Sequence, residues 1–331
     1  MYRILSIEGG GVRGIIPATI LMKLEEEIQK VTNDPTKTLA DYFDMIAGTS
    51  CGAILSCLYL LPEVTNNNKI RPKYSASEVA KVFKEGIPSI FVKTWSGLVW
   101  EGPEYKSEGL QKLAIDIAKD TIVSDLIKPI FIPTYDLVGG TPFYFSLTEH
   151  REYKVRDLIQ SATAAPTFFA PVTLTSPNTH EEIHTLIDGG VFMNNPSYAA
   201  LLSALDTLKK LPTEKRPSRI ILASISCGCN NDKLPPGAAK WGKLSWISPL
   251  INISIDMNAD IVDKQLMNIF DLCGDVNDYY RFDPPLKEGS NSIDNISPKN
   301  LEGLETDALN YVNIPEIKAQ ISNLAKVLTG K

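Results

Sequence analysis

The sequence is poor in histidine, in clustered basic residues and in long apolar runs. It contains three histidines and five cysteines, and its formal net charge is -6. An odd number of cysteines in a chain of 331 residues does not indicate a disulfide framework, so we expect a reducing compartment. Binding of a nucleic acid polymer through a broad basic surface is excluded, because no dense run of lysine and arginine is present.

No stretch of the chain has the length and apolarity of a membrane span. The most apolar segment, residues 53–61, is far shorter than the roughly 20 residues that a span requires, and it stops at Pro62. Residues 2–7 have the pattern of a strand, with neither the basic nor the long apolar region of a secretory leader. We therefore expect a cytoplasmic protein whose contact with membranes is peripheral.

The order strand, glycine turn, helix occurs twice near the start of the chain. Residues 2–7 are apolar and lead into a run of glycines, after which a helix is expected from near Ile16, with Pro17 in its first turn. Residues 42–47 and 51–61 follow as a second strand and an apolar, buried helix. This order predicts an α/β fold with a central, mainly parallel sheet flanked by helices.

The first helix is expected to be amphipathic, burying Ile20, Leu24 and Ile28 and exposing Glu25 and Glu26. Further strands are expected at residues 127–135, 143–147, 183–187 and 219–225, and further helices at residues 197–208, 247–272 and 315–328. The segment 89–105 is rich in aromatic residues and punctuated by glycine and proline, which is typical of a cap rather than of a core element.

No internal repeat or linker divides the chain. We therefore expect a single domain over residues 1–331, with its core motifs in residues 1–200 and its C-terminal helices, residues 247–329, packed on that core.

Residues 48–52 have the sequence Gly-Thr-Ser-Cys-Gly, which follows a predicted strand and precedes a predicted helix. This is the pattern of a nucleophile elbow, in which Gly48 and Gly52 leave room for a sharp turn that presents Ser50. The start of the helix also favours negative charge beside Ser50, and the N–H of Cys51 is a candidate donor to an oxyanion. A merely structural turn of glycine and serine is the alternative.

Residues 9–14 have the sequence Gly-Gly-Gly-Val-Arg-Gly and allow two interpretations. Gly9, Gly11 and Gly14 satisfy the spacing of a dinucleotide-binding turn, but the second strand ends in glycine rather than in the acidic residue which that site needs. The other interpretation is an anion-binding turn, in which the N–H groups of Gly10 and Gly11 stabilise a developing oxyanion. Arg13 either adds positive charge there or forms an ion pair elsewhere.

A serine nucleophile needs a base, and Asp188 is the preferred candidate. It ends a predicted strand and is followed by Gly189 and Gly190, which allow close approach of substrate or backbone. His184 is on the same predicted strand and stays as an alternative, whereas His150 is expected in a solvated turn. Because an exposed aspartate is a weak base, Asp188 is predicted to be partly buried and hydrogen-bonded directly to Ser50.

The motifs at residues 9–14, 48–52 and 188–190, in this order, resemble those of the patatin-like phospholipase family. Further similar stretches lie at residues 130–136, 161–169, 194–196 and 241–244, so that the resemblance covers most of the chain. Three ordered motifs are more specific than any one of them. The ending Ser-Cys-Gly at residues 226–228 departs from the more usual Gly-Thr-Gly type and puts only the surrounding loop in doubt.

The resemblance implies a three-layer fold and a Ser–Asp dyad without histidine. Ser50 would be the nucleophile and Asp188 the base, and the oxyanion hole would comprise Gly9, Gly10, Gly11 and Cys51. The implied activity is that of a lipid acyl hydrolase of phospholipase A or lysophospholipase type, which uses an acyl-enzyme intermediate and neither metal nor cofactor. Its substrates would be membrane phospholipids or other acyl lipids.

Three alternatives stay open. Some bacterial patatin-like proteins are effectors of antiviral defence that cyclic nucleotides activate, and a small-molecule activator of that kind would suit this chain. A storage or binding protein with a vestigial site is an alternative of another class. A nucleotide-dependent dehydrogenase is the third, and it would use the glycine turn at residues 9–14.

Overall fold

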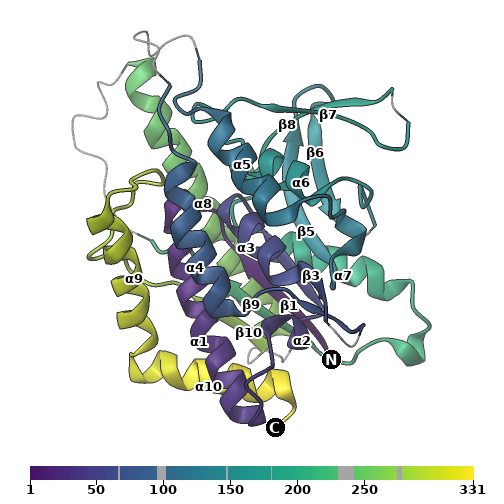
Figure 1. Cartoon of the computed structure of the whole chain (residues 1–331). Coiled ribbons are helices and arrows are strands. Elements are labelled where there is room, and N and C mark those ends of the chain that lie inside the picture. Colours follow the sequence, from purple (N-terminus) through teal and green to yellow (C-terminus); the bar gives the residue numbers. More distant parts are fainter. Residues whose placement is uncertain (66–67, 95–101, 147, 180, 230–241, 274–277) are drawn as a thin grey trace.

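The computed structural model (Figure 1) describes residues 1–65, 68–94, 102–146, 148–179, 181–229, 242–273 and 278–331. Its strands are β1 (Tyr2–Ile7), β2 (Met45–Gly48), β3 (Pro62–Val64), β4 (Ile70–Pro72), β5 (Ile130–Asp136), β6 (Thr141–Ser146), β7 (Val172–Thr175), β8 (Ile183–Asp188), β9 (Ile220–Ile225) and β10 (Tyr279–Phe282). Its α-helices are α1 (Ile15–Thr32), α2 (Leu39–Tyr42), α3 (Cys51–Leu60), α4 (Ala76–Gly86), α5 (Ser107–Ala118), α6 (Val155–Ala162), α7 (Ser197–Lys209), α8 (Lys243–Leu272), α9 (Pro298–Val312) and α10 (Pro315–Thr329).

A mixed sheet with the strand order β10-β9-β1-β2-β5-β8-β7 forms the centre of the molecule. The strands from β10 to β5 run parallel to one another. Beyond β5 the direction alternates, because β8 and β6 are both antiparallel to β5, and β7 is antiparallel to β8. The predicted α/β fold with a mainly parallel sheet is therefore confirmed.

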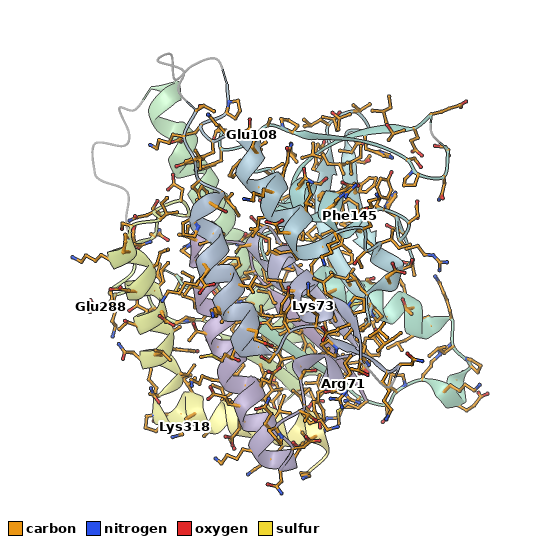
Figure 2. The ribbon with its side chains drawn as sticks, viewed as in Figure 1. Arg71, Lys73, Glu108, Phe145, Glu288 and Lys318 are labelled. Carbon is orange, nitrogen blue, oxygen red and sulfur yellow. The ribbon has the colours of Figure 1, made fainter. Side chains whose placement is uncertain are left out.

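Helices cover both faces of the sheet, which gives three layers (Figure 1). Because side chains alternate along a strand, neighbouring residues of β1 enter different cores. Leu5 and Ile7 pack in the larger core with α1, α3, α4, α9 and α10, whereas Ile4 packs in the smaller core with α7 and α8. Figure 2 shows Phe145 inside the molecule and the charged Glu288 and Lys318 at its edge.

The parallel strands explain why the first elements of the chain are so apolar. A strand covered by helices on both faces needs apolar side chains at every position, as in β2 and most of β9. Helix α3 is likewise buried along its whole length between the sheet and other helices. Within the described part of the chain, no helix combines the length and the apolarity that a bilayer span needs.

Several elements differ from the sequence-based expectations. Helices α2, α4, α5, α6 and α9 and strands β3, β4, β7 and β10 were not expected. The strand expected from residue 42 begins at Met45, because Tyr42 ends α2. The strand expected from residue 127 begins at Ile130, and α8 begins at Lys243 rather than at residue 247. Part of the aromatic segment, including Trp95 and Trp100, lies outside the described residues.

The prediction that Glu25 faces solvent is wrong. Glu25 is 3% exposed, and its carboxylate accepts hydrogen bonds from the backbone N–H of Leu39 at 2.9 Å and of Ala76 at 2.7 Å. These two N–H groups open α2 and α4, where the helix itself supplies no acceptor. Burial raises the pKa of Glu25, and its two backbone hydrogen bonds oppose this effect. One side chain of α1 thus anchors the starts of two other helices.

Replacing Glu25 by alanine is expected to lower the free energy of unfolding by about 2–4 kcal/mol, because two buried N–H groups lose their acceptor. Urea unfolding followed by circular dichroism measures this change. Glu26→Ala is the matched control on the same helix, since Glu26 is exposed and, among the described residues, pairs only with Lys23. It should change stability by less than about 1 kcal/mol. Equal effects of the two variants would contradict the anchoring role.

Candidate active site

The pairing of the strands brings Ser50 and Asp188 to the same level of the sheet. Ala47 of β2 is paired with Phe131 of β5, so that the positions three residues further along are Ser50 and Thr134. Thr134 is in turn paired with Asp188 at the end of β8. Strand β8 runs antiparallel to β5 but pairs only with its last three residues, so that this register places the end of β8 near the carboxyl ends of the parallel strands. This is the edge at which open α/β sheets bind their ligands.

Ser50 lies between β2 and α3 in a strained backbone conformation. Its φ of 56° and ψ of -120° are rare for a residue with a side chain, and such a conformation costs about 1–3 kcal/mol. The turn is tight because a Cβ atom on Gly48 would lie 2.2 Å from the carbonyl oxygen of Gly52, and one on Gly52 would lie 2.4 Å from that of Ile7. The geometry is that expected of a nucleophile elbow.

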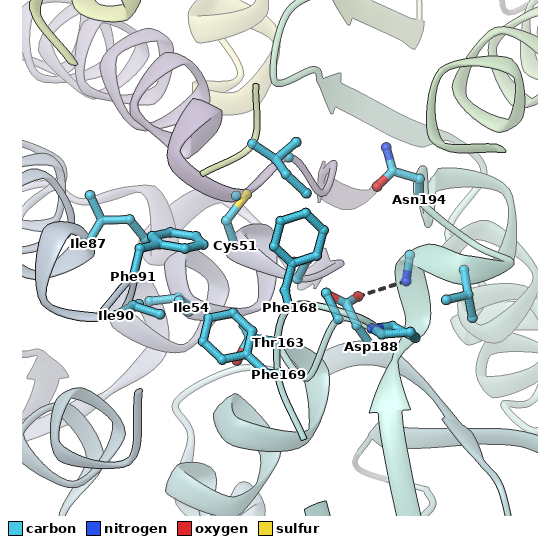
Figure 3. A pocket seen from close by; sticks show the side chains of 18 residues that line it. Cys51, Ile54, Ile87, Ile90, Phe91, Thr163, Phe168, Phe169, Asp188 and Asn194 are labelled. Atoms are coloured by element: carbon cyan, nitrogen blue, oxygen red, sulfur yellow. Dashed lines mark hydrogen bonds between the residues drawn. The ribbon is translucent and has the colours of Figure 1, made fainter. Parts of the chain in front are cut away.

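The carboxylate of Asp188 is 4% exposed, and the hydroxyl group of Ser50 lies close enough to influence its pKa. The carboxylate accepts a hydrogen bond from the backbone N–H of Gly190 at 2.8 Å, which Figure 3 shows as a dashed line. Burial raises the pKa of Asp188 to about 6, although the hydroxyl of Ser50 and the N–H of Gly190 both act to lower it. Its own N–H donates to the carbonyl of Ala164. The predicted burial of Asp188 is therefore confirmed, and its direct hydrogen bond to Ser50 stays a prediction.

The glycine loop approaches Ser50 from β1. The N–H of Gly9 donates to the carbonyl of Asn194 at 3.2 Å, and the amide of Asn194 donates back to the carbonyl of Gly9 at 3.3 Å. The prediction of Gly9 as an oxyanion donor is therefore wrong for this structure, because its N–H is already engaged. Gly9 instead lies against Ser50, where its Cβ would be 3.2 Å from that of Ser50.

Three backbone N–H groups near Ser50 have no acceptor among the residues that the structure describes: those of Gly10, Gly11 and Cys51. All three residues line one cavity together with Ser50. Gly11 has a φ of 59°, which favours glycine. The N–H of Cys51 is at the start of α3, where the helix dipole favours negative charge.

Arg13 orients this loop from behind. It is 2% exposed, and both its backbone N–H and its Nε face the carbonyl of Gly10, at 3.1 and 3.5 Å. Because the carbonyl of Gly10 and the N–H of Gly11 belong to one planar trans peptide, they point in opposite directions, and the N–H of Gly11 is turned away from Arg13. Arg13 forms no ion pair with a described residue, and its guanidinium donates instead to oxygens of Gly228 and Asn291. Gly14 ends the turn against Phe83.

The histidine alternative for the base finds no geometric support. His184 is buried, and its Nδ1 lies 2.8 Å from Oδ2 of Asp136. Its ring packs against Phe143, and it does not line the cavity that contains Ser50. His150 is indeed in a turn, but it is half-buried and stacks on Phe143 rather than lying free in solvent.

The cavity beside Ser50 has a volume of about 250 Å³ and a mostly apolar wall. Figure 3 shows the side chains that point into it, and the larger apolar ones are Ile54, Ile87, Ile90, Phe91, Phe168 and Phe169. Phe91, which belongs to the aromatic segment predicted as a cap, is buried and lines the cavity. Ser50 and Asp188 line the same cavity. A chain of apolar carbon atoms bound here would have its polar end at the dyad.

Sequence reasoning missed two contributors. In the sequence, Asn194 was noted only as part of a stretch that resembles the family. In the structure it forms two hydrogen bonds with Gly9, one through its backbone carbonyl and one through its side-chain amide. Ile293 lines the cavity from a loop far along the chain, and no motif there could have indicated it. Among the described residues, no group of three or more His, Cys, Asp or Glu side chains is placed to hold a metal ion.

These features define an α/β protein with a serine at an elbow, a buried carboxylate as its partner and free N–H groups beside it. The sequence model described as patatin-like phospholipase matches residues 5–201. The chain belongs to the patatin-like phospholipase family, whose members act typically as lipid acyl hydrolases.

The similarity extends over most of the chain in several plant relatives. Patatin-like protein 2 of Oryza sativa subsp. indica is 35% identical, over 92% of this chain and 82% of its own. Patatin-like protein 1 of Arabidopsis thaliana is 30% identical, over 92% of this chain and 80% of its own. A third relative, 29% identical over 100% of this chain and 93% of its own, is named "Probable inactive patatin-3-Kuras 1" of Solanum tuberosum. Family membership alone therefore does not establish turnover.

The buried carboxylate makes a prediction for stability. The pKa of Asp188 is about 6 in the folded protein, whereas the unfolded chain has the ordinary value of 3.8. The folded protein therefore holds this proton more tightly, and wild type loses stability as the pH rises from about 4 to about 6. At about 1.4 kcal/mol per pKa unit, the loss is about 3 kcal/mol. Asparagine does not titrate, so Asp188→Asn does not have this pH-dependent loss. The free energy of unfolding of the variant, relative to that of wild type, should therefore increase by about 3 kcal/mol between about pH 4 and about pH 7.

Urea unfolding at a series of pH values measures this difference. Asp120→Asn serves as a control, because Asp120 is exposed and its pKa is lowered by Lys154, so that its difference should be small and opposite in sign. A difference for Asp188→Asn that does not change with pH would show that its carboxyl group titrates normally.

Proposed function

We propose that the protein is a lipid acyl hydrolase in which Ser50 is the nucleophile and Asp188 the general base. The observation that carries this proposal is the position of the strained Ser50 beside a buried carboxylate whose pKa is raised to about 6. A carboxylate with this pKa is ionised at neutral pH and is a stronger base than an ordinary aspartate. Both groups line one apolar cavity.

In the first half of the reaction, the Oγ–H bond of Ser50 breaks and the proton passes to Asp188 while Oγ bonds to the acyl carbonyl carbon. The carbonyl oxygen becomes an oxyanion and accepts hydrogen bonds from the N–H groups of Gly10, Gly11 and Cys51. Donors of this kind stabilise a transition state by about 2.7–4 kcal/mol each. The intermediate collapses to an acyl-enzyme, and the leaving alcohol takes the proton from Asp188.

In the second half, Asp188 takes a proton from a water molecule whose oxygen attacks the acyl carbon. Collapse breaks the bond to Oγ and releases the fatty acid, and the proton held by Asp188 returns to Ser50. Arg13 does not take part in proton transfer here. It positions the peptide that joins Gly10 and Gly11.

The apolar wall of the cavity supports an acyl chain as the group that enters it. We infer that the substrates are esters of membrane lipids, such as phospholipids, lysophospholipids or glycolipids, which the enzyme meets from the membrane surface. Cyclic nucleotide activation finds no specific support in the described residues, and addition of cyclic dinucleotides to the assay tests it directly.

Loss of either member of the dyad is expected to abolish turnover. Ser50→Ala should lose labelling by a fluorophosphonate probe completely, and Asp188→Asn should lower both labelling and release of fatty acid from phospholipid vesicles by more than about 1,000-fold. His184→Gln is the control, because His184 is equally buried and on the same strand but contacts Asp136 instead. It should keep both signals within a few-fold of wild type.

The opposite result, with activity lost in His184→Gln and kept in Asp188→Asn, would assign the base to histidine. Absence of labelling in folded wild type would favour a binding protein with a vestigial site, as the name of the potato relative suggests for that protein. A change in fluorescence of an added nicotinamide cofactor without labelling would favour the dehydrogenase alternative.

The dependence of activity on pH is expected to follow Asp188. Because the base must be ionised, kcat/KM for a short ester should rise with pH and level off above the pKa of about 6. A pH–rate profile measured with a p-nitrophenyl ester determines this limb. A midpoint near the ordinary value of 3.8 would indicate that Asp188 is not desolvated in the working enzyme.

A further inference from the structure

The loop between β10 and α9 contributes one wall of the cavity, although it lies outside residues 5–201, which match the family model. Ile293 lines the cavity beside Gly11. The carbonyl of Ile293 accepts the N–H of Val12 at 2.9 Å, and a Cβ atom on Gly11 would lie only 2.0 Å from that same oxygen. The loop and the candidate oxyanion site are therefore in direct contact.

The residues on both sides of Ile293 attach segment 291–294 to two other parts of the site. Oδ1 of Asn291 accepts a hydrogen bond of 2.6 Å from the guanidinium of Arg13, which also holds Gly10. On the other side, Asp294 accepts a hydrogen bond of 2.7 Å from the hydroxyl group of Tyr105. Segment 291–294 thus spans the distance from the oxyanion loop to the aromatic wall.

Tyr105 belongs to the aromatic cluster that encloses the cavity. Its ring centroid lies 5.1 Å from that of Phe91, 6.1 Å from that of Phe168 and 5.7 Å from that of Phe169. The three phenylalanines line the cavity, and Tyr105 supports them from behind. The hydrogen bond to Asp294 therefore fixes the position of segment 291–294 relative to this cluster.

Two buried side chains of α9 hold the loop in place. Asp307 is 4% exposed and accepts the backbone N–H groups of Lys287, Glu288 and Gly289. Asn300 is 5% exposed, accepts the N–H of Ser290 and donates to the carbonyl of Asn295. The loop is thus fixed on both sides of segment 291–294, as a wall must be if it is to discriminate between ligands.

We propose that segment 291–294 is a specificity-determining wall of the acyl site, in which Ile293 limits the width available to the first carbon atoms of the acyl group. This inference rests on the proposed function. Ile293 contacts Gly11 and lines the same cavity as Ser50, so we expect an acyl group bonded to Ser50, with its oxygen at Gly10 and Gly11, to extend past Ile293. Straight acyl chains fit there, and chains branched next to the carbonyl meet the side chain of Ile293.

The test compares straight and branched acyl groups in variants of this wall. Ile293→Ala should raise kcat/KM for p-nitrophenyl isobutyrate relative to p-nitrophenyl butyrate by about tenfold, the usual effect of space for one methyl group. Ile293→Val should give a smaller shift of the same sign. Tyr105→Phe keeps the ring but loses the hydrogen bond to Asp294, and it should also relax the preference. Ile296→Ala is the matched control, because Ile296 packs on the core and does not line the cavity.

A second measurement needs no turnover. Displacement of cis-parinaric acid by decanoic acid and by 2-methyldecanoic acid gives the same comparison as a ratio of dissociation constants. Ile293→Ala should improve binding of the branched acid relative to the straight one, and Ile296→Ala should not. If wild type hydrolyses neither ester but the binding ratio shifts, the proposed function fails and the wall is supported. A ratio within twofold of wild type in correctly folded Ile293→Ala, or no displacement by either acid, overturns the inference.

Discussion

The site depends on one close contact, between the end of β2 and the first turn of α3. The backbone has to reverse within a few residues, and it does so because neither Gly48 nor Gly52 has a side chain at the point where strand and helix touch. The remaining strain is concentrated in Ser50. Such strain persists only where the surroundings determine the backbone, and here α3 is buried along its whole length. The apolar character of α3, which says nothing about chemistry by itself, is thus what keeps Ser50 in position.

The second requirement is a carboxylate next to Ser50, and the pairing of β8 with β5 places Asp188 there. Strand β8 is antiparallel to β5, and its end would reach the opposite edge of the sheet if the two strands paired over their full lengths. It pairs instead only with the last three residues of β5, so that Asp188 ends its strand near Ser50 and the chain then turns through Gly189 and Gly190. The antiparallel part of the sheet, from β5 to β8, is therefore needed to form the site.

Local signals allowed much of the fold and most of the site to be predicted. The strand, turn and helix around Ser50 lie within a short stretch, and each has its own pattern. The errors arose where distant parts of the chain decide the outcome. Glu25 looks exposed on a helical pattern, but it is buried by helices that start at Leu39 and Ala76. Helix α4 carried a readable capping signal in Ser75 and Glu78 that was overlooked, whereas nothing near Ile293 could have indicated that it reaches the cavity.

The same contrast explains why Gly9 was assigned wrongly. Three consecutive glycines offer three N–H groups, and sequence alone cannot distinguish which of them are free. Asn194 takes that of Gly9, and Arg13 fixes the carbonyl of Gly10 so that the next N–H is turned away from it. The number of N–H groups left free in this loop is therefore set by residues that contact it from behind. Arg13 also donates to Asn291, so the glycine loop and the wall proposed to border an acyl group are positioned by one buried guanidinium. A substitution in the glycine loop should therefore shift segment 291–294, and a substitution in that segment should shift the loop. The reason is that Arg13, which joins them, has no carboxylate among the described residues to hold it in place independently.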